Sequence, residues 1–174
     1  MRLRDKKIAF LIDDGFEDLE FWVTVMRLKE EGAKVTIVDP EGRKDYRGKN
    51  GLSATADVCV KSVNAADFDA VVIPGGWAQD KMRRYEAVKR FVKDMHSTGK
   101  IVGLICHAGL VGISAGIVKG HRATGSLGIQ DDLINAGATW VDEPAFRDGN
   151  LVWGRVVADI PDFCRELVAA IEQP

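Results

Sequence analysis

The sequence predicts an α/β fold built on a parallel sheet. Short β-branched, apolar runs alternate with amphipathic stretches of helical length from Lys7 to Pro161, which is the pattern of repeated βαβ units. The length of 174 residues suits one compact core. Neither a linker nor a repeat nor a low-complexity tract interrupts the pattern, so we expect a single domain spanning residues 1–174.

The first three elements form a strand, a helix and a strand. "KIAFLID" (7–13) is typical of a buried strand, and "EDLEFWVTVMRLKEEG" (17–32) of a helix that stops at its glycine. "AKVTIVDP" (33–40) is a second strand, closed by proline. The helix face expected to meet the core carries Leu19, Trp22, Val23, Met26 and Leu28.

The middle of the chain continues the alternation after a polar excursion. Residues 41–63 are polar and glycine-rich, which indicates a hairpin or loop. "FDAVVIPGG" (68–76) resumes the core strand pattern, residues 80–99 predict one long amphipathic helix, and "KIVGLIC" (100–106) predicts another buried strand.

The last third adds helices and a hairpin. A short helix is expected from Ala108, followed by a polar segment at 119–126 and a helix at 128–137. Residues 139–156 predict strands around an Asp-Gly turn. Residues 159–172 predict the final helix.

Composition excludes several classes of partner. The formal net charge is -2, so no field favours nucleic acid or an anionic membrane. The apolar runs are too short for a signal peptide or a membrane span, and we expect a cytoplasmic protein. The three cysteines, Cys59, Cys106 and Cys164, are too far apart for a metal or disulfide motif. Nucleotide and dinucleotide motifs are also missing, so we expect no metal and no cofactor.

Cys106 is the candidate nucleophile. It follows a buried strand pattern and precedes His107 and the small residues Ala108 and Gly109. Functional groups of open α/β sheets gather at the carboxyl ends of the strands. There, a helix N-terminus and an imidazole can lower a thiol pKa to roughly 3.5–7.5. The competing interpretation, a small buried core residue, fits the other two cysteines better.

Glu17 is the candidate carboxyl group. It lies in "DDGFED", directly after the first predicted strand and therefore at the same edge of the sheet. A carboxyl group kept protonated by apolar surroundings could donate a hydrogen bond to the thiolate or orient His107. The competing interpretation is compensation of the helix dipole, for which acidic residues are common in first turns.

The turn at Pro74, Gly75 and Gly76 is the third candidate. Consecutive glycines let backbone N–H groups approach a developing oxyanion, although an ordinary strand-to-helix turn has the same composition. His96 and His121 lie in a helix end and a basic polar segment, so we expect both to be solvated rather than catalytic.

With these residues assembled, the sequence resembles the ThiJ/PfpI superfamily. Within it, the chain is similar to the PfpI-type intracellular cysteine peptidases and their deglycase and stress-protein relatives. The segments "FEDLE", "FDAVVIPGGWA", "ICH", "ISAGIVKG" and "GIQDDLINAGATWVD" stand in the family order. The resemblance implies a flavodoxin-like three-layer sandwich, with a mostly parallel central sheet and helices on both faces.

The resemblance also implies a role for each candidate. Cys106 would be the nucleophile, His107 its partner and Glu17 the carboxyl group touching the thiol. The backbone of Gly76 and His107 would form an oxyanion hole. Asp80 matches the position of a family glutamate that a neighbouring subunit contributes to orient the histidine.

The substrate pocket is where this chain departs from the family pattern. Gly75, Trp77, Ala108 and Ser126 would line it. Ala108 belongs to "CHAG", where the family usually has "CHGP", and Ser126 stands where tyrosine is frequent in the family. The resemblance further implies a homodimer or a larger homo-oligomer such as a hexamer.

Two classes of function follow. The first is a cysteine hydrolase of the PfpI type in stress protection: a peptidase or amidase, or a cofactor-free glyoxalase or deglycase acting on methylglyoxal or its protein adducts. The second is a redox-sensing stress protein or holdase chaperone with an oxidisable Cys106. A glutamine amidotransferase is disfavoured, because that chemistry needs a downstream histidine and none follows His121.

Overall fold

A seven-stranded sheet forms the centre of the computed structural model, which describes residues 1–174. The strand order is β10-β11-β7-β6-β1-β2-β5, and every neighbouring pair is parallel except β10 with β11. The strands are β1 (Lys7–Leu11), β2 (Lys34–Asp39), β5 (Val58–Cys59), β6 (Ala70–Ile73), β7 (Ile101–Ile105), β10 (Ala145–Asp148) and β11 (Leu151–Gly154). The predicted mostly parallel sheet is confirmed.

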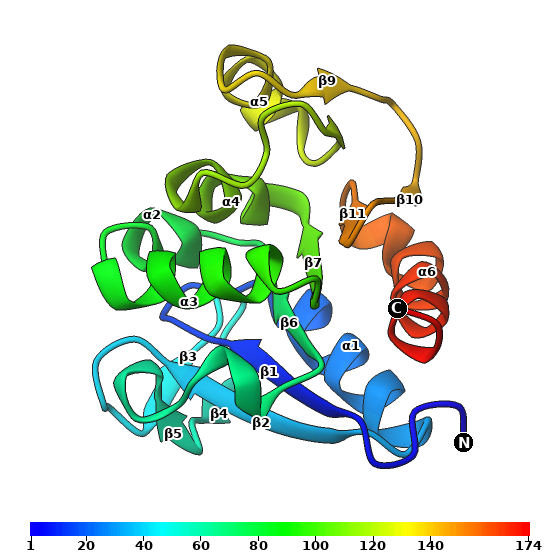
Figure 1. Cartoon of the computed structure of the whole chain (residues 1–174). Coiled ribbons are helices and arrows are strands. Elements are labelled where there is room, and N and C mark those ends of the chain that lie inside the picture. The colour runs from blue at the N-terminus through cyan, green and yellow to red at the C-terminus, as the bar shows by residue number, and fades with distance from the viewer.

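Helices cover both faces of this sheet, as predicted. On one side lie α1 (Asp18–Glu30) and α6 (Ile160–Glu172), which contact each other, and on the other α2 (Ala78–Met82), α3 (Glu86–Ser97) and α4 (Gly109–Ala115) (Figure 1). Two small sheets complete the fold: the hairpin of β3 (Asp45–Arg47) with β4 (Ser53–Thr55), and the parallel pair β8 (Arg122–Ala123) and β9 (Thr139–Trp140) beside α5 (Gln130–Asn135). None of the helices has the length and apolar character needed to cross a membrane.

The core lies between the sheet and its two helix layers. All residues of β6 and β7 are buried, as expected for strands covered on both faces. Gly103 of β7 gives α6 its close approach, because a Cβ atom there would lie 2.9 Å from Leu167 of α6. β6 and β7 pair in parallel, with Ile73 opposite Leu104, so their carboxyl ends lie side by side.

The buried face of α1 differs from the predicted one. Leu19, Val23 and Met26 are 48%, 42% and 61% exposed, and of the five residues expected in the core only Leu28 is fully buried. The face that meets the core carries Glu20, Phe21, Thr24, Val25 and Leu28, together with Asp18 at the helix start. The prediction followed the most apolar stripe, whereas packing selected a stripe that includes polar side chains.

The long helix predicted over residues 80–99 is two helices. Tyr85 adopts an extended backbone with φ -85° and ψ 117°, which interrupts the helical hydrogen bonds between α2 and α3. Its hydroxyl group donates to Glu41 at 3.1 Å, a long-range contact that local periodicity does not reveal.

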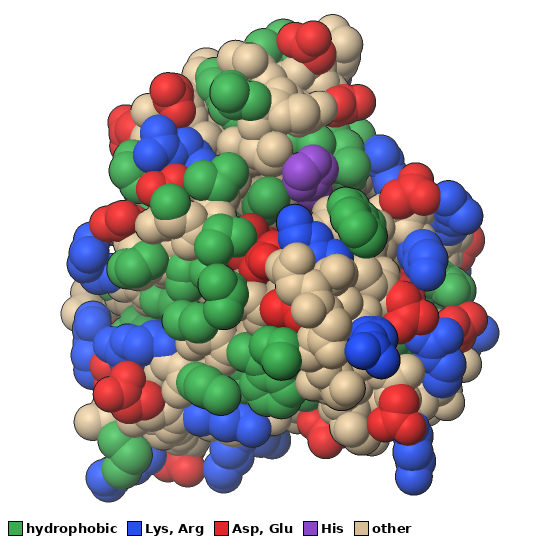
Figure 2. All heavy atoms as spheres, turned by 180° about the vertical axis from the view of Figure 1, so that it is seen from behind, with side chains coloured by type: hydrophobic (Ala, Val, Ile, Leu, Met, Phe, Trp, Pro, Cys, Tyr) green, Lys and Arg blue, Asp and Glu red, His purple; other side chains and the backbone are tan.

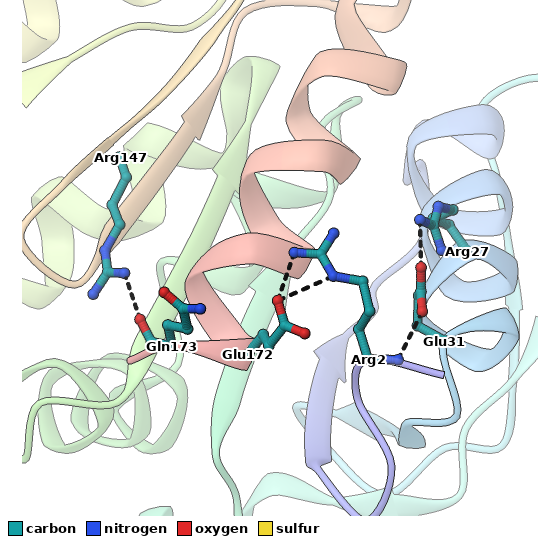
Figure 3. Close-up of polar contacts among 6 residues, drawn as sticks. All are labelled: Arg2, Arg27, Glu31, Arg147, Glu172 and Gln173. Carbon is teal, nitrogen blue, oxygen red and sulfur yellow. Dashed lines mark hydrogen bonds and ion pairs between the residues drawn. The ribbon is translucent and has the colours of Figure 1, made fainter.

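The N-terminal segment is tied to the two helices on one face of the sheet (Figure 3). The Arg2 guanidinium pairs with Glu172 at 2.6 Å, and the Arg2 backbone N–H donates to Glu31 at 2.9 Å. Leu3 beside it is fully buried. Polar contacts at the surface and one apolar anchor therefore join the chain start to the ends of α1 and α6.

Candidate active site

Cys106 stands on a sharp turn at the carboxyl end of β7. It is one of two non-glycine residues with positive φ, at 60°, a conformation that costs roughly 1–3 kcal/mol and is common at functional sites. A 3-10 turn over Cys106–Ala108 then leads into α4. The half-buried thiol is thereby lifted out of the sheet, as the sequence predicts for a nucleophile.

Two backbone N–H groups and an imidazole converge on the Cys106 sulfur. The backbone N–H groups of Gly76 and His107 both donate toward it, and the imidazole Nδ1 of His107 lies 3.2 Å from Sγ. The two N–H groups are the pair expected to form an oxyanion hole. Gly76 can take its place because its φ of 89° suits glycine, and a Cβ atom there would collide with the backbone of Gly15 and Phe16.

The carboxyl group beside the thiol belongs to Glu20, not to Glu17. Glu20 is fully buried on the inner face of α1 and hydrogen-bonds with Cys106. Its Oε2 accepts the backbone N–H of Gly75 at 2.6 Å, while Oε1 has no other hydrogen-bond partner. Gly75 lies against both groups, and a Cβ atom there would collide with the Glu20 carboxyl group and lie 2.7 Å from the Cβ of Cys106. The prediction that Glu17 touches the thiol is therefore wrong.

Glu17 instead caps its own helix. Its Oε2 accepts the backbone N–H groups of Leu19 and Glu20, both at 2.8 Å, and its Oε1 accepts from the Asn50 amide at 3.1 Å. This is the role of a helix N-cap residue, close to the helix-dipole interpretation that the sequence left open. The sequence favours Glu17 because it follows the first strand more closely than Glu20 does. A carboxyl group within the buried stripe of Phe21, Val25 and Leu28 is the signal that could have identified Glu20.

Glu20 and Cys106 titrate as a coupled pair. Burial raises the pKa of Glu20 to about 7, although the hydrogen bond from the Gly75 N–H lowers it. Burial and the charge of ionised Glu20 raise the pKa of the Cys106 thiol to about 12, although the hydrogen bonds from the N–H groups of His107 and Gly76 lower it. The predicted lowering of this thiol pKa is thus not found while Glu20 is ionised. When the shared proton lies on Glu20, the carboxyl group becomes a donor and the sulfur a thiolate held by N–H groups.

His107 is poised as a neutral base. Burial lowers its pKa, and the positive charge of Lys49 lowers it further, so the imidazole is neutral at pH 7. No carboxylate of the same chain hydrogen-bonds with its ring. Asp80, the residue expected to orient it, lies exposed on α2 and pairs with Arg84. A role for Asp80 across a subunit interface stays a prediction.

The expected pocket residues divide into two groups. Gly75 and Ser126 adjoin the nucleophile, since the Ser126 N–H donates to the Cys106 carbonyl at 3.1 Å, and Trp77 follows Gly76 with 69% of its surface exposed. Ala108 is fully buried, so the structure does not place it on the open side of the site. No group of three or more His, Cys, Asp or Glu side chains is arranged to hold a metal ion.

Chemically, the site combines a thiol, a neutral imidazole and two aligned N–H donors. The thiolate form can add to a carbonyl carbon, and the N–H groups can hold the resulting oxyanion. His107 can move a proton on the adduct. Electrophilic carbonyl compounds are the substrates that this arrangement suits.

Comparison with known proteins gives consistent matches over nearly the full chain. Residues 6–170 match the DJ-1/PfpI family. The chain is 42% identical over 166 residues to "Deglycase PH1704" of Pyrococcus horikoshii, covering 95% of this chain and 99% of the relative. It is 38% identical over 170 residues to "General stress protein 18" of Bacillus subtilis, covering 97% of this chain and 99% of the relative.

The fold also matches a solved structure. A two-domain protein from Anabaena variabilis, with DJ-1/ThiJ/PfpI-like and ferritin-like domains, superposes with a TM-score of 0.93 and 40% identity. The match covers 95% of this chain and 48% of that protein. The present chain thus spans about half the length of this neighbour.

Proposed function

The chain belongs to the DJ-1/PfpI family, and from this premise we propose that it is a cysteine-dependent glyoxalase or deglycase that attacks 2-oxoaldehydes such as methylglyoxal and their protein adducts. The observation that carries the proposal is the fully buried Glu20 against Cys106. A buried carboxyl group hydrogen-bonded to the thiol can exchange a proton with it, and the form with this proton on Glu20 leaves a thiolate that can attack a carbonyl carbon. The similarity to a protein named as a deglycase supports the same chemistry.

The proposed cycle starts with addition of the Cys106 thiolate to the aldehyde carbon of methylglyoxal. The oxyanion of the resulting hemithioacetal accepts hydrogen bonds from the N–H groups of Gly76 and His107. His107 removes the proton from this carbon and returns it to the neighbouring carbon, which gives a thioester of lactate. Water then cleaves the thioester, so the balance is methylglyoxal plus water to lactate.

A panel of variants tests this cycle. Methylglyoxal turnover should fall at least about a thousandfold in Cys106→Ser and about a hundredfold in Glu20→Gln, because the latter loses a proton donor. The matched control Glu17→Gln changes a carboxyl group one helical turn away and should lose less than about tenfold. Lactate formation, followed by an enzyme-coupled assay, gives the rates.

Two results would contradict the proposal. One is an unchanged rate in Cys106→Ser; the other is an equal loss in Glu17→Gln and Glu20→Gln. A small peptide substrate run in parallel identifies a peptidase instead, if it is cleaved in a Cys106-dependent manner while methylglyoxal is not.

The redox-sensing alternative rests on the same N–H donors, which would also hold the oxygens of an oxidised sulfur. Mild peroxide followed by intact mass measurement separates the two functions. Preferential oxidation at Cys106, in a protein that turns over neither methylglyoxal nor the peptide, would favour the redox sensor.

A further inference from the structure

A cavity of about 690 Å³ opens beside the candidate active site. It lies between the turn after β1, the β3–β4 hairpin loop and the start of α2. The lining residues are Asp14, Gly15, Arg47, Gly48, Lys49, Asn50, Gly51, Trp77 and Lys81. Apart from the Trp77 side chain, the lining is polar or glycine and includes three cations, which is unusual for a site that would hold only a small uncharged aldehyde.

The charges of this cavity are unbalanced. Arg47, Lys49 and Lys81 line it, and none of the three forms an ion pair with a carboxylate of the chain. The one carboxylate in the lining, Asp14, already pairs with Arg43 and accepts the backbone N–H of Arg47 at 3.0 Å. Among the lining residues, three cations thus face one engaged anion; the other carboxylates nearby are Asp18, beneath the loop, and Asp13, on which the charge of Lys81 acts.

Lys49 connects this cavity to the reacting groups. Its positive charge acts on both Glu20 and His107, so it lies within electrostatic reach of the catalytic centre. Its backbone N–H donates to the carbonyl of Phe16 at 2.9 Å. Trp77, which also lines the cavity, directly follows Gly76, whose N–H faces the thiol.

The loop that carries Lys49 is held by α1. Both carboxylate oxygens of Asp18, which is 2% exposed, accept backbone N–H groups from this loop: Asn50 at 2.8 Å and Leu52 at 2.7 Å. Gly48 lies so close that a Cβ atom there would collide with the Asp18 carboxylate. A buried anchor therefore fixes the backbone from which the Lys49 side chain extends.

We propose that this cavity is an anion subsite, and that the substrate of the proposed reaction is a carbonyl compound whose far end carries a carboxylate or phosphate group. Lys49 binds the anionic end, with Arg47 and Lys81 adding to the field, while the reactive carbonyl lies at Cys106. Trp77 offers a flat surface for the connecting carbon chain. The inference rests on the proposed function for the reaction, and on the three lining cations that form no ion pair for the charge of the substrate.

Two 2-oxoaldehydes that differ in charge test the specificity. Methylglyoxal is neutral, whereas 4,5-dioxovalerate carries a carboxylate and would give 2-hydroxyglutarate by the same steps. The kcat/KM ratio of the anionic to the neutral substrate should fall about tenfold in Lys49→Gln, the size expected for one charged hydrogen bond. Lys49→Arg should keep most of the ratio, and Lys93→Gln, which changes an exposed lysine on α3, should leave it unchanged.

Alkylation of Cys106 tests the subsite without any turnover. Iodoacetate is anionic and iodoacetamide neutral, and both react at the thiolate. Relative to glutathione at the same pH, the iodoacetate to iodoacetamide rate ratio of Cys106 should be raised about tenfold. It should fall in Lys49→Gln and as salt increases. Succinate and inorganic phosphate, compared at equal ionic strength as protectants against iodoacetamide, distinguish a carboxylate site from a phosphate site.

The two assays separate failure of the subsite from failure of the reaction. A raised alkylation ratio that depends on Lys49, in a protein that turns over neither aldehyde, supports the anion subsite and contradicts the proposed function. Alkylation and kcat/KM ratios that are the same in wild type and Lys49→Gln overturn the subsite. So does the absence of protection by both anions.

Discussion

At the residue scale, the position of one carboxyl group decides the chemistry of the site. Glu17 and Glu20 are three residues apart in "FEDLE". Glu17 binds backbone N–H groups of its own helix, while Glu20 meets Gly75 and Cys106. Burial raises the pKa of Glu20 to about 7, which makes a proton available beside the thiol. The same burial makes Glu20 a cost to folding.

The buried Glu20 predicts how the free energy of unfolding depends on pH. Below about pH 4.5 Glu20 is protonated in both states, and between about pH 4.5 and 7 it is ionised only when unfolded, so rising pH favours unfolding. Glu20→Gln removes the titrating group, and with it the loss of stability as the pH rises. The variant should therefore match wild type near pH 4 and be more stable at pH 8 by roughly 3 kcal/mol, because burial raises the pKa of Glu20 from 4.5 to about 7.

Urea unfolding at a series of pH values measures this difference. Taking the difference between variant and wild type cancels the other titrating groups, among them Asp13, whose pKa burial raises to about 6. A constant difference across the whole range would show that Glu20 is not held in its neutral form.

At the scale of the element, the phase of α1 places both its apolar residues and its catalytic candidate. The helix presents Leu19, Val23 and Met26 outward, and hydrophobic side chains gather on the face seen from behind (Figure 2). Its inward stripe includes Glu20 and Thr24 among apolar residues. The rotation of the helix about its axis therefore accounts for the wrongly predicted buried face, and it also brings Glu20 rather than Glu17 to the inner side.

Two valines on α1 test this phase. Val25 is 2% exposed and Val23 42% exposed, so the same Val→Ala change should differ in cost. We expect a loss of about 2 kcal/mol for Val25→Ala and less than about 0.5 kcal/mol for Val23→Ala in urea unfolding. Equal losses in the two variants would contradict the orientation of the helix.

At the scale of the whole molecule, the sheet order brings the site together. β7 and β6 are neighbours, and β1 lies next to β6, so the segments after these strands meet at one edge. Cys106 follows β7, Gly75 and Gly76 follow β6, and Glu20 enters from the helix after β1. The orienting group expected for His107 is the one part that a single chain does not supply.

Mixing two inactive variants tests whether a neighbouring subunit supplies the group that orients His107. If Asp80 acts across a subunit interface, Cys106→Ser and Asp80→Asn are each deficient. Dissociated and reassembled as an equal mixture, they should regain roughly a quarter of wild-type activity, because in random dimers about a quarter of the sites have both residues. Activity after mixing that equals the sum of the separate variants would show that Asp80 does not act in this way.

The sequence by itself determined the elements and the edge at which the chemistry lies. Apolar periodicity and glycine positions predicted the strands, and the ends of parallel strands predicted where Cys106, His107 and the Gly75–Gly76 turn would meet. These features depend on local pattern and on the general rules of parallel sheets. They are therefore readable without long-range information.

Only the tertiary structure decided the rotation of α1, the break at Tyr85 and the charges around Lys49. Each depends on partners far away in the chain: the Gly75 N–H for Glu20, Glu41 for Tyr85 and Asp18 for the hairpin loop. A helix with apolar residues on more than one side has no unique inward face in sequence. Packing chose the face that could satisfy a buried carboxyl group, and with it the reactive partner of Cys106.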